Sequence, residues 1–236
     1  GFTNKTGGLV IEDNFLQKLK ERDKKSINSP TKQIDNKDNY ITLFSYENSK
    51  LIDLLKSFSI FAKKQKYLLT IIVFEGKPLN NINNLLNLKL RVGDTYTLDN
   101  LAIKVSPMVD QDKYDYLLIG SYINLVRGED SIVRAMLTGN PFLWHIYPQE
   151  ENAHFDKINA LFDRMDEFCS DKESVEILRQ LTLSYNGNSD FIHNFDLSSF
   201  IEKWKKLSEE WRDYLLSLGS LTDNLLAFIR EKNQFS

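Results

Sequence analysis

The sequence predicts an α/β fold, in which a largely parallel β-sheet is covered by helices on both of its faces. Between residues 40 and 146, apolar segments of strand length alternate with segments that show helical spacing. The apolar segments are continuous, which is typical of parallel strands buried on both faces. After Pro148 only helical patterns follow. We therefore expect an interdomain segment and linker at residues 1–39, a sheet domain at residues 40–170, and a helical tail at residues 171–236 that packs on it.

Five segments are rich in apolar, β-branched and aromatic residues and are expected to form the strands. They cover residues 40–46, 67–75, 101–105, 122–126 and 142–146. The second, YLLTIIVFE, has almost no polar residues and is followed closely by Gly76 and Pro78, which end it. Helical segments separate the strands, so right-handed β-α-β connections are expected.

Segments with apolar residues at helical spacing are expected to form the helices. They cover residues 15–25, 50–62, 80–87, 111–119 and 130–137, and then residues 152–168, 173–183, 197–218 and 221–231. Ser49 is expected to cap the second helix, because a serine hydroxyl can accept a hydrogen bond from the first free amides of a helix. Residues 26–39 are polar, contain Pro30 and lack apolar periodicity, which indicates a linker or surface loop.

The composition excludes several classes of protein. The 236 residues are 42% hydrophobic and 27% charged, as in globular rather than disordered or fibrous proteins. Thirty Lys and Arg against 33 Asp and Glu give a net charge of −3, without the basic footprint of a nucleic-acid binder. No apolar run approaches the roughly 18–20 residues of a membrane-spanning helix, and the single cysteine suits a reducing compartment. We expect a cytoplasmic protein with no nucleic-acid or membrane partner, and the start at Gly1 favours a fragment.

One strand is followed by residues suited to binding an anion. Gly128 allows the backbone to turn sharply and a ligand to approach it closely. The helix that follows presents free N–H groups and a partial positive charge, and Arg127 adds a full one, so the site suits a diphosphate. The alternative is that Glu129, Asp130 and Ser131 only cap the helix, since acidic residues and serine are favoured there. From the residues alone, both interpretations remain open.

Two further loops follow strands of the same predicted sheet, at residues 44–46 and 107–114. The carboxyl ends of parallel strands lie at one edge of a sheet, where ligands of such folds bind. Aromatic side chains in these loops, such as Phe44, Tyr46 and Tyr114, could form a pocket for a nucleobase. Aromatic residues at strand ends are also common in hydrophobic cores, which is the alternative interpretation.

Several strings of residues resemble one known family. RGEDS at residues 127–131 and WHIYPQ at residues 144–149 closely resemble the protein-arginine rhamnosyltransferases that modify bacterial translation elongation factor P. GFTNKTGGL at residues 1–9 and LFSYEN at residues 43–48 match the same family. The resemblance runs in order to about Arg164. It implies that the fold is the Rossmann-like C-terminal half of a GT-B glycosyltransferase.

The resemblance also implies an activity. The family transfers L-rhamnose from dTDP-β-L-rhamnose to an arginine guanidinium of elongation factor P, with inversion at the anomeric carbon and without a metal or other cofactor. Its N-terminal half binds the acceptor protein and supplies the aspartate that acts as general base. That half is absent from this sequence, so we expect this chain to bind the donor but to turn over poorly or not at all.

Eleven residues lie at positions of the family's donor site. Those implied in donor binding are Phe44, Tyr46, Met108, Gln111, Tyr114, Arg127, Gly128, Asp130, Ser131 and Tyr147, and the one implied in catalysis is Glu129. In the family's pattern, Gln111 and Tyr114 surround the nucleoside, and Arg127 and Tyr147 contact the diphosphate. Met108 stands where the family usually has a phenylalanine against thymine, so weaker stacking is expected, although its polarizable sulfur can still contact a base.

Other residues are expected to have structural roles. His145 lies in an apolar strand and is interpreted as a core histidine, Cys169 as an inert thiol, and Trp204 and Trp211 as packing residues on one helix face. Two other functions remain open. One is a GT-B transferase or epimerase for another nucleotide sugar, and the other is a catalytically silent module that binds a nucleotide sugar or a protein.

Overall fold

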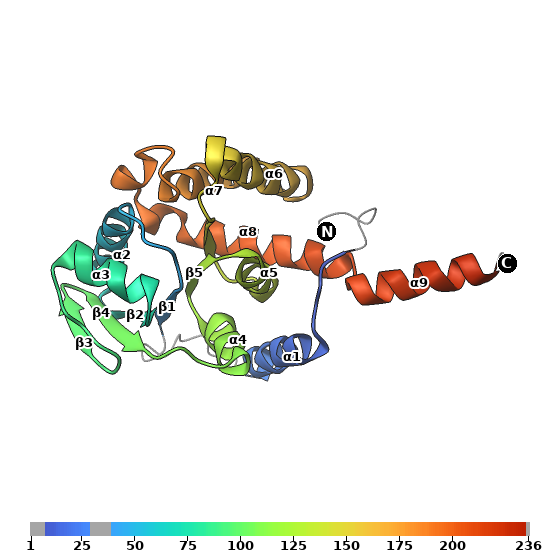
Figure 1. The fold of residues 1–236 in the computed structure, drawn as a ribbon, viewed down its shortest axis with the longest axis horizontal. Coiled ribbons are helices and arrows are strands. Elements are labelled where there is room, and N and C mark those ends of the chain that lie inside the picture. Colours follow the sequence, from blue (N-terminus) through green and yellow to red (C-terminus); the bar gives the residue numbers. More distant parts are fainter. Residues whose placement is uncertain (1–7, 29–38, 235–236) are drawn as a thin grey trace.

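The computed structural model describes residues 8–28 and 39–234, in which a six-stranded sheet has the order β3-β4-β2-β1-β5-β6 (Figure 1). The strands are β1 (Tyr40–Leu43), β2 (Leu69–Phe74), β3 (Thr95–Leu98), β4 (Leu101–Ser106), β5 (Ile123–Arg127) and β6 (Phe142–His145). All neighbouring strands are parallel except β3 and β4. The predicted α/β class is therefore confirmed, with one antiparallel edge strand added.

Helices surround this sheet and form the C-terminal part of the chain. They are α1 (Asp13–Asn28), α2 (Leu51–Gln65), α3 (Lys77–Leu86), α4 (Gln111–Gly120), α5 (Glu129–Thr138), α6 (Ala153–Phe168), α7 (Lys172–Tyr185), α8 (Leu197–Ser217) and α9 (Leu221–Gln234), with short 3-10 turns η1 (Glu150–Asn152) and η2 (Phe191–Asn194). The predicted linker at residues 26–39 lies mostly outside the described residues. No helix of the described part of the chain is both long and apolar enough to cross a membrane.

The order of the strands places the helices on both faces. From β1 the chain moves through α2 to β2 on one side, whereas from β5 it moves through α5 to β6 on the other. Because such connections are right-handed, the two opposite directions put α2 and α5 on opposite faces. The direction changes between β1 and β5, and this switch point is where open parallel sheets bind ligands.

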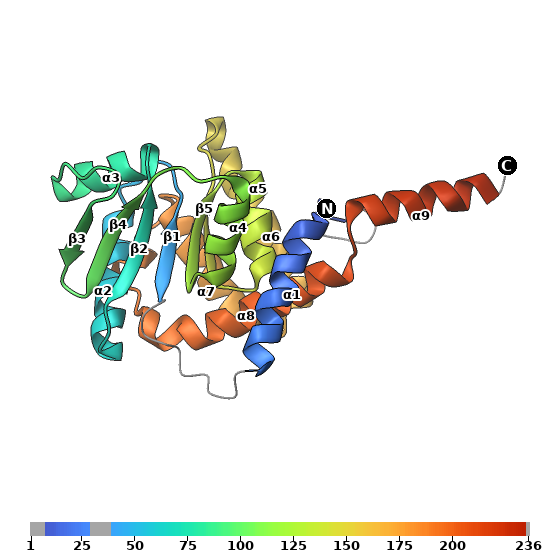
Figure 2. The ribbon, with the colours of Figure 1, turned by 90° about the horizontal axis from the view of Figure 1, so that it is seen from below.

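Flanking helices extend the core beyond the sheet. Phe15 of α1 is buried, and α1 packs beside α4, as both views of the ribbon show (Figures 1 and 2). In α8, Trp204 and Trp211 are fully buried, and the indole N–H of Trp211 donates to Met136 Sδ of α5 at 3.2 Å. Helix α9 projects from the body (Figure 1) and carries half-exposed apolar side chains such as Phe228.

Three local details differ from the sequence-based expectations. Strand β1 ends at Leu43, so residues 44–46 form a loop at the sheet edge. Ser49 does not cap α2; instead, Asn48 Oδ1 accepts a hydrogen bond from the Lys50 backbone N–H at 2.9 Å. Strand β3 was not predicted. It pairs with β4 through a tight turn, in which Asp99 adopts a left-handed conformation with φ 51°.

Candidate functional site

The predicted site residues come from loops and helix starts that follow parallel strands. Phe44 and Tyr46 follow β1, Met108 follows β4, and Arg127 ends β5. Because these strands are parallel, the segments meet at the carboxyl edge of the sheet, around the switch point between β1 and β5. The structure thus brings together residues that lie far apart in the sequence.

Three aromatic rings form the base of the site. The Phe44 ring lies 5.9 Å from Phe74 and 5.6 Å from Tyr114, and the last two lie 5.7 Å apart, all in edge-to-face arrangements. This geometry is favourable for aromatic pairs and fixes the rings with respect to one another. Phe74 was not among the predicted site residues, although it ends β2 at the same sheet edge.

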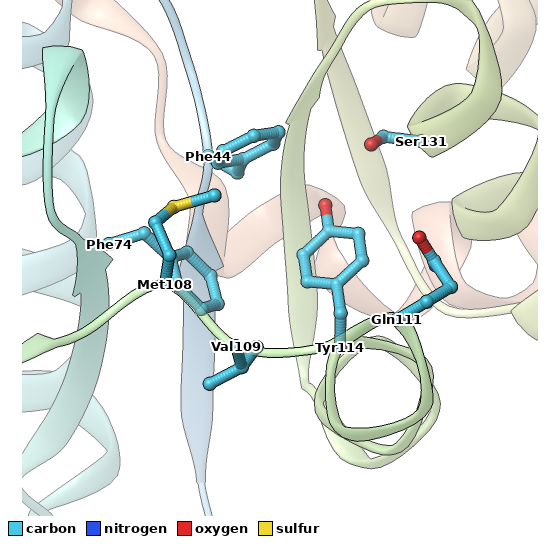
Figure 3. Close-up of a pocket in the computed structure, with 7 residues that line it drawn as sticks. All are labelled: Phe44, Phe74, Met108, Val109, Gln111, Tyr114 and Ser131. Atoms are coloured by element: carbon cyan, nitrogen blue, oxygen red, sulfur yellow. The ribbon is translucent and has the colours of Figure 1, made fainter.

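A cavity of about 120 Å³ lies beside these rings, which form part of its wall (Figure 3). It is lined by Phe44, Phe74, Met108, Val109, Gln111, Tyr114 and Ser131. The backbone N–H of Met108 donates to Glu75 Oε1 at 2.9 Å, which ties its loop to the end of β2, while the Met108 side chain is 54% exposed. Ligand pockets are typically about 300–1,000 Å³, so this cavity would hold one part of a larger ligand.

Polar groups complete the wall opposite Met108. Burial raises the pKa of Tyr114 to about 12, so its hydroxyl stays protonated at neutral pH. This hydroxyl points into the same space that Ser131 borders (Figure 3). Gln111 is held from behind, where its Nε2 donates to Asp115 Oδ1 at 3.0 Å. The cavity therefore combines apolar faces with a small number of fixed polar groups.

Arg127 lies beside the cavity, stacked against aromatic rings. Its guanidinium carbon is 4.4 Å from the centre of the Phe44 ring and 4.8 Å from that of Tyr46. Such cation–π contacts orient a guanidinium without neutralising its charge. Among residues 8–28 and 39–234, no carboxylate forms an ion pair with Arg127. Its positive charge therefore remains available to an anion.

Gly128 connects Arg127 to the start of helix α5. Its φ of 69° is in the region that favours glycine, and no heavy atom lies within 4 Å of the position that a Cβ would occupy. The indole N–H of Trp144 donates to the Gly128 carbonyl at 2.9 Å and holds this turn in place. The space that a Gly128 Cβ would fill is therefore open, and it lies beside a helix start, whose free amides suit an anion.

The two acidic residues that follow have different surroundings. The Glu129 side chain is 86% exposed, and its nearest cation is Lys157 Nζ at 3.9 Å. Asp130 Oδ2 accepts from Arg134 Nε at 2.9 Å, so its carboxylate is held by its own helix. Glu129 is thus free to approach a ligand at the helix start, whereas Asp130 is positioned by its partner.

A second group of rings continues the site along β6. Tyr46 contacts both His145 and Tyr147, each with ring centres 5.5 Å apart, and Tyr147 is largely exposed. His145 is buried, as expected. Burial, then the charge of Arg127, lower its pKa to about 4, so it is neutral at pH 7. Within the described ranges, no three His, Cys, Asp or Glu side chains are grouped so that they could hold a metal ion.

Comparison with known proteins gives consistent results. A family model described as Elongation-Factor P (EF-P) rhamnosyltransferase EarP matches residues 1–230. The protein-arginine rhamnosyltransferase of Pseudomonas aeruginosa is 32% identical over 224 residues, which are 90% of this chain and 57% of that relative. The one from Pseudomonas putida is 38% identical over 167 residues, 68% of this chain and 43% of the relative.

A solved structure supports the same relationship. It concerns EarP-mediated arginine glycosylation of translation elongation factor EF-P, is 26% identical to this chain, and superimposes with a TM-score of 0.77 over 98% of this chain and 74% of its own. The chain spans only about half the length of the curated relatives that it matches. A match over nearly all of the sequence, together with this shared fold, shows that the chain belongs to the EarP family of EF-P rhamnosyltransferases.

Proposed function

We propose that this chain is the donor-binding part of an enzyme that transfers L-rhamnose from dTDP-β-L-rhamnose to an arginine of elongation factor P. One observation carries the proposal: Arg127, which has no carboxylate partner among the described residues, lies beside the open, glycine-initiated start of α5 at the switch point of the sheet. This arrangement suits a diphosphate, and the aromatic cavity beside it suits a pyrimidine base.

The geometry suggests how the donor would react. The departing dTDP gains negative charge as the sugar–oxygen bond breaks. Arg127 and the amides at the start of α5 are placed to stabilise that charge without reorganising. Glu129 is exposed at the same helix start, two residues after Arg127, and is the residue we assign to orienting the sugar or the ribose. The acceptor arginine would come from elongation factor P, and the general base would be contributed by the part of the longer relatives that this chain does not match.

Titration calorimetry with dTDP tests donor binding. We expect dTDP and dTDP-rhamnose to bind, and Arg127→Gln to weaken binding by about 10-fold or more, since hydrogen bonds to charged groups contribute about 1.5–3 kcal/mol. Arg91→Gln removes the same charge from an exposed position before border strand β3, away from the start of α5, and should leave affinity unchanged. Absence of dTDP binding would contradict the proposal.

Transfer itself is tested with a longer protein, which also includes the region that the relatives have and that this chain does not match. We expect that protein, but not this chain alone, to add rhamnose to elongation factor P, as measured by intact mass. Preference for UDP over dTDP would favour a different nucleotide sugar. Tight dTDP binding without transfer by the longer protein would favour a silent binding module.

A further inference from the structure

A buried carboxylate lies directly behind the cavity, among α1, α4 and α5. Asp115 is only 1% exposed and accepts hydrogen bonds from three side chains. Its Oδ1 accepts from Gln111 Nε2 and from Arg134 Nη1, both at 3.0 Å, and its Oδ2 accepts from Lys18 Nζ at 2.9 Å. Asp115 itself does not line the cavity.

This arrangement fixes which end of the Gln111 amide faces the cavity. A carboxylate between two cations can only accept hydrogen bonds, so the NH₂ group of Gln111 must point toward Asp115. Turning the amide would place two oxygens against each other and leave a buried acceptor facing an acceptor. The Gln111 oxygen therefore remains on the cavity side, where the side chain reaches toward Ser131 (Figure 3).

The carboxylate is itself held in place from two sides. Arg134 is almost fully buried and also donates to Glu12 Oε1 at 2.6 Å, and it pairs with Asp130. Lys18 also pairs with the exposed Asp112 at 2.6 Å. Because both cations are anchored elsewhere, Asp115 cannot rotate to release Gln111 without breaking buried ion pairs.

We propose that Asp115 is a positioning residue. By holding the Gln111 amide, it keeps a hydrogen-bond acceptor on this wall of the cavity, so that the cavity selects nucleosides with a hydrogen-bond donor at that place. The inference rests on the proposed function. The nucleoside of dTDP has only two donors, the N3–H of thymine and the 3′-hydroxyl of the sugar. One of them pairs with Gln111 Oε1, while Asp115 acts through Gln111 without touching the ligand.

Two analogues of dTDP show which of its two hydrogen-bond donors pairs with Gln111. N3-methyl-dTDP lacks the base N–H, and 3′-deoxy-dTDP lacks the hydroxyl. We expect one of them to bind the unchanged chain about 10-fold more weakly than dTDP, as the loss of one neutral hydrogen bond implies. In Gln111→Met, which keeps the length of the side chain, that difference should disappear. A difference that persists in Gln111→Met would reflect steric fit and would overturn the inference.

The role of Asp115 is tested in a variant that leaves no buried charge unpaired. In the double variant Lys18→Met with Asp115→Leu, one buried ion pair becomes apolar, while Arg134 keeps Glu12 and Asp130. The Gln111 amide can then turn, so the 10-fold discrimination should fall to about twofold or less. Lys18→Met alone keeps Asp115 against Gln111 and should discriminate as the unchanged chain does. Equal discrimination by both would overturn the proposal.

A measurement on the unchanged chain covers the case in which the double variant does not fold. The side-chain NH₂ signals of Gln111 can be assigned in nitrogen-15 spectra by their loss in Gln111→Met. Because one of the two protons donates to Asp115, it should exchange with solvent more slowly than the other, both before and after dTDP is added. Protection that arises only on dTDP binding would overturn the inference. Equal binding of all three nucleotides would also overturn it and leave the proposed function intact, whereas no dTDP binding would overturn both.

Discussion

His145 shows how the surroundings of one residue set the charge of the site. It lies in β6 between the rings of Tyr46 and Tyr185, and burial, followed by the nearby positive charge of Arg127, lowers its pKa to about 4. The site therefore contains no additional positive charge from this imidazole at neutral pH. Among the described residues, Arg127 and Lys77 are the cations that contact the Tyr46 ring, at 4.8 Å and 5.6 Å from its centre.

The lowered pKa of His145 predicts a specific pH dependence of stability. An unfolded histidine takes up a proton near pH 6.5, but the folded one does so only near pH 4. Between these values the unfolded chain binds more protons, so stability is retained above pH 6.5 and falls as the pH drops toward 4, by up to about 3 kcal/mol.

We expect His145→Asn to lack this part of the pH dependence, as measured by urea unfolding at pH 7, 6 and 5. His193→Asn is the matched control, because His193 is exposed, and it should behave as the unchanged chain does. The same slope in His145→Asn and in the unchanged chain would contradict the assignment.

Gly128 offers a second test at a single residue. Ala at a φ of 69° and a ψ of −174° costs about 1–3 kcal/mol, and its Cβ would meet no protein atom but would occupy the space before α5. We expect Gly128→Ala to lose this much stability and to bind dTDP several-fold more weakly. Gly93→Ala has a φ of 93° and similar open space but lies before border strand β3 rather than at the start of α5, so it should lose stability without losing affinity. Equal affinity of the two variants for dTDP would count against an anion at Gly128.

At the scale of elements, the ion pairs of Arg134 join α5 to α4 and to Glu12, the residue that precedes α1. Arg134→Met would leave Asp115 with Lys18 as its only cation, and breaking a buried pair costs about 3–5 kcal/mol. Glu12→Gln removes a half-exposed partner of the same guanidinium and should cost less than about 1 kcal/mol. Urea unfolding measures both. Similar losses of stability in the two variants would show that the buried Arg134–Asp115 pair is not the main contribution of Arg134 to stability.

Particular elements show what the sequence can predict. The strands that form the parallel part of the sheet were recognisable because they are continuously apolar, and residues 69–74 lie within a predicted segment. Strand β3 was missed because it alternates between exposed and half-buried residues and is only four residues long, although the Asp99–Asn100 turn beside it was a usable signal.

The site, too, was only partly predictable from the sequence. The strings around Arg127 and Phe44 indicated its two sides, and their positions after strands indicated that they meet. The contact of Asp115 with Lys18 joins residues 97 positions apart in the sequence. No periodicity or motif predicts such a pair, because it depends on how α1 packs on α4.

At the scale of the whole molecule, the helical tail is part of the same core as the sheet. Trp211 packs into α5, whose start forms the proposed anion site. We expect Trp211→Ala to cost about 3–5 kcal/mol in urea unfolding, the usual cost of removing a large buried side chain. Phe228→Ala, on exposed helix α9, should change stability by no more than about 0.5 kcal/mol. A small effect at Trp211 would mean that the tail is a separable addition.

Strand β3 also affects how copies of this protein behave toward one another. It forms one border of the sheet, is four residues long, and exposes Thr95 and Thr97 rather than apolar side chains. A border this short and polar gives a neighbouring molecule few backbone groups to pair with, which is how natural sheets avoid aggregation. Strand β3, paired with β4, therefore covers an edge of the sheet along which copies of the protein could otherwise associate strand to strand.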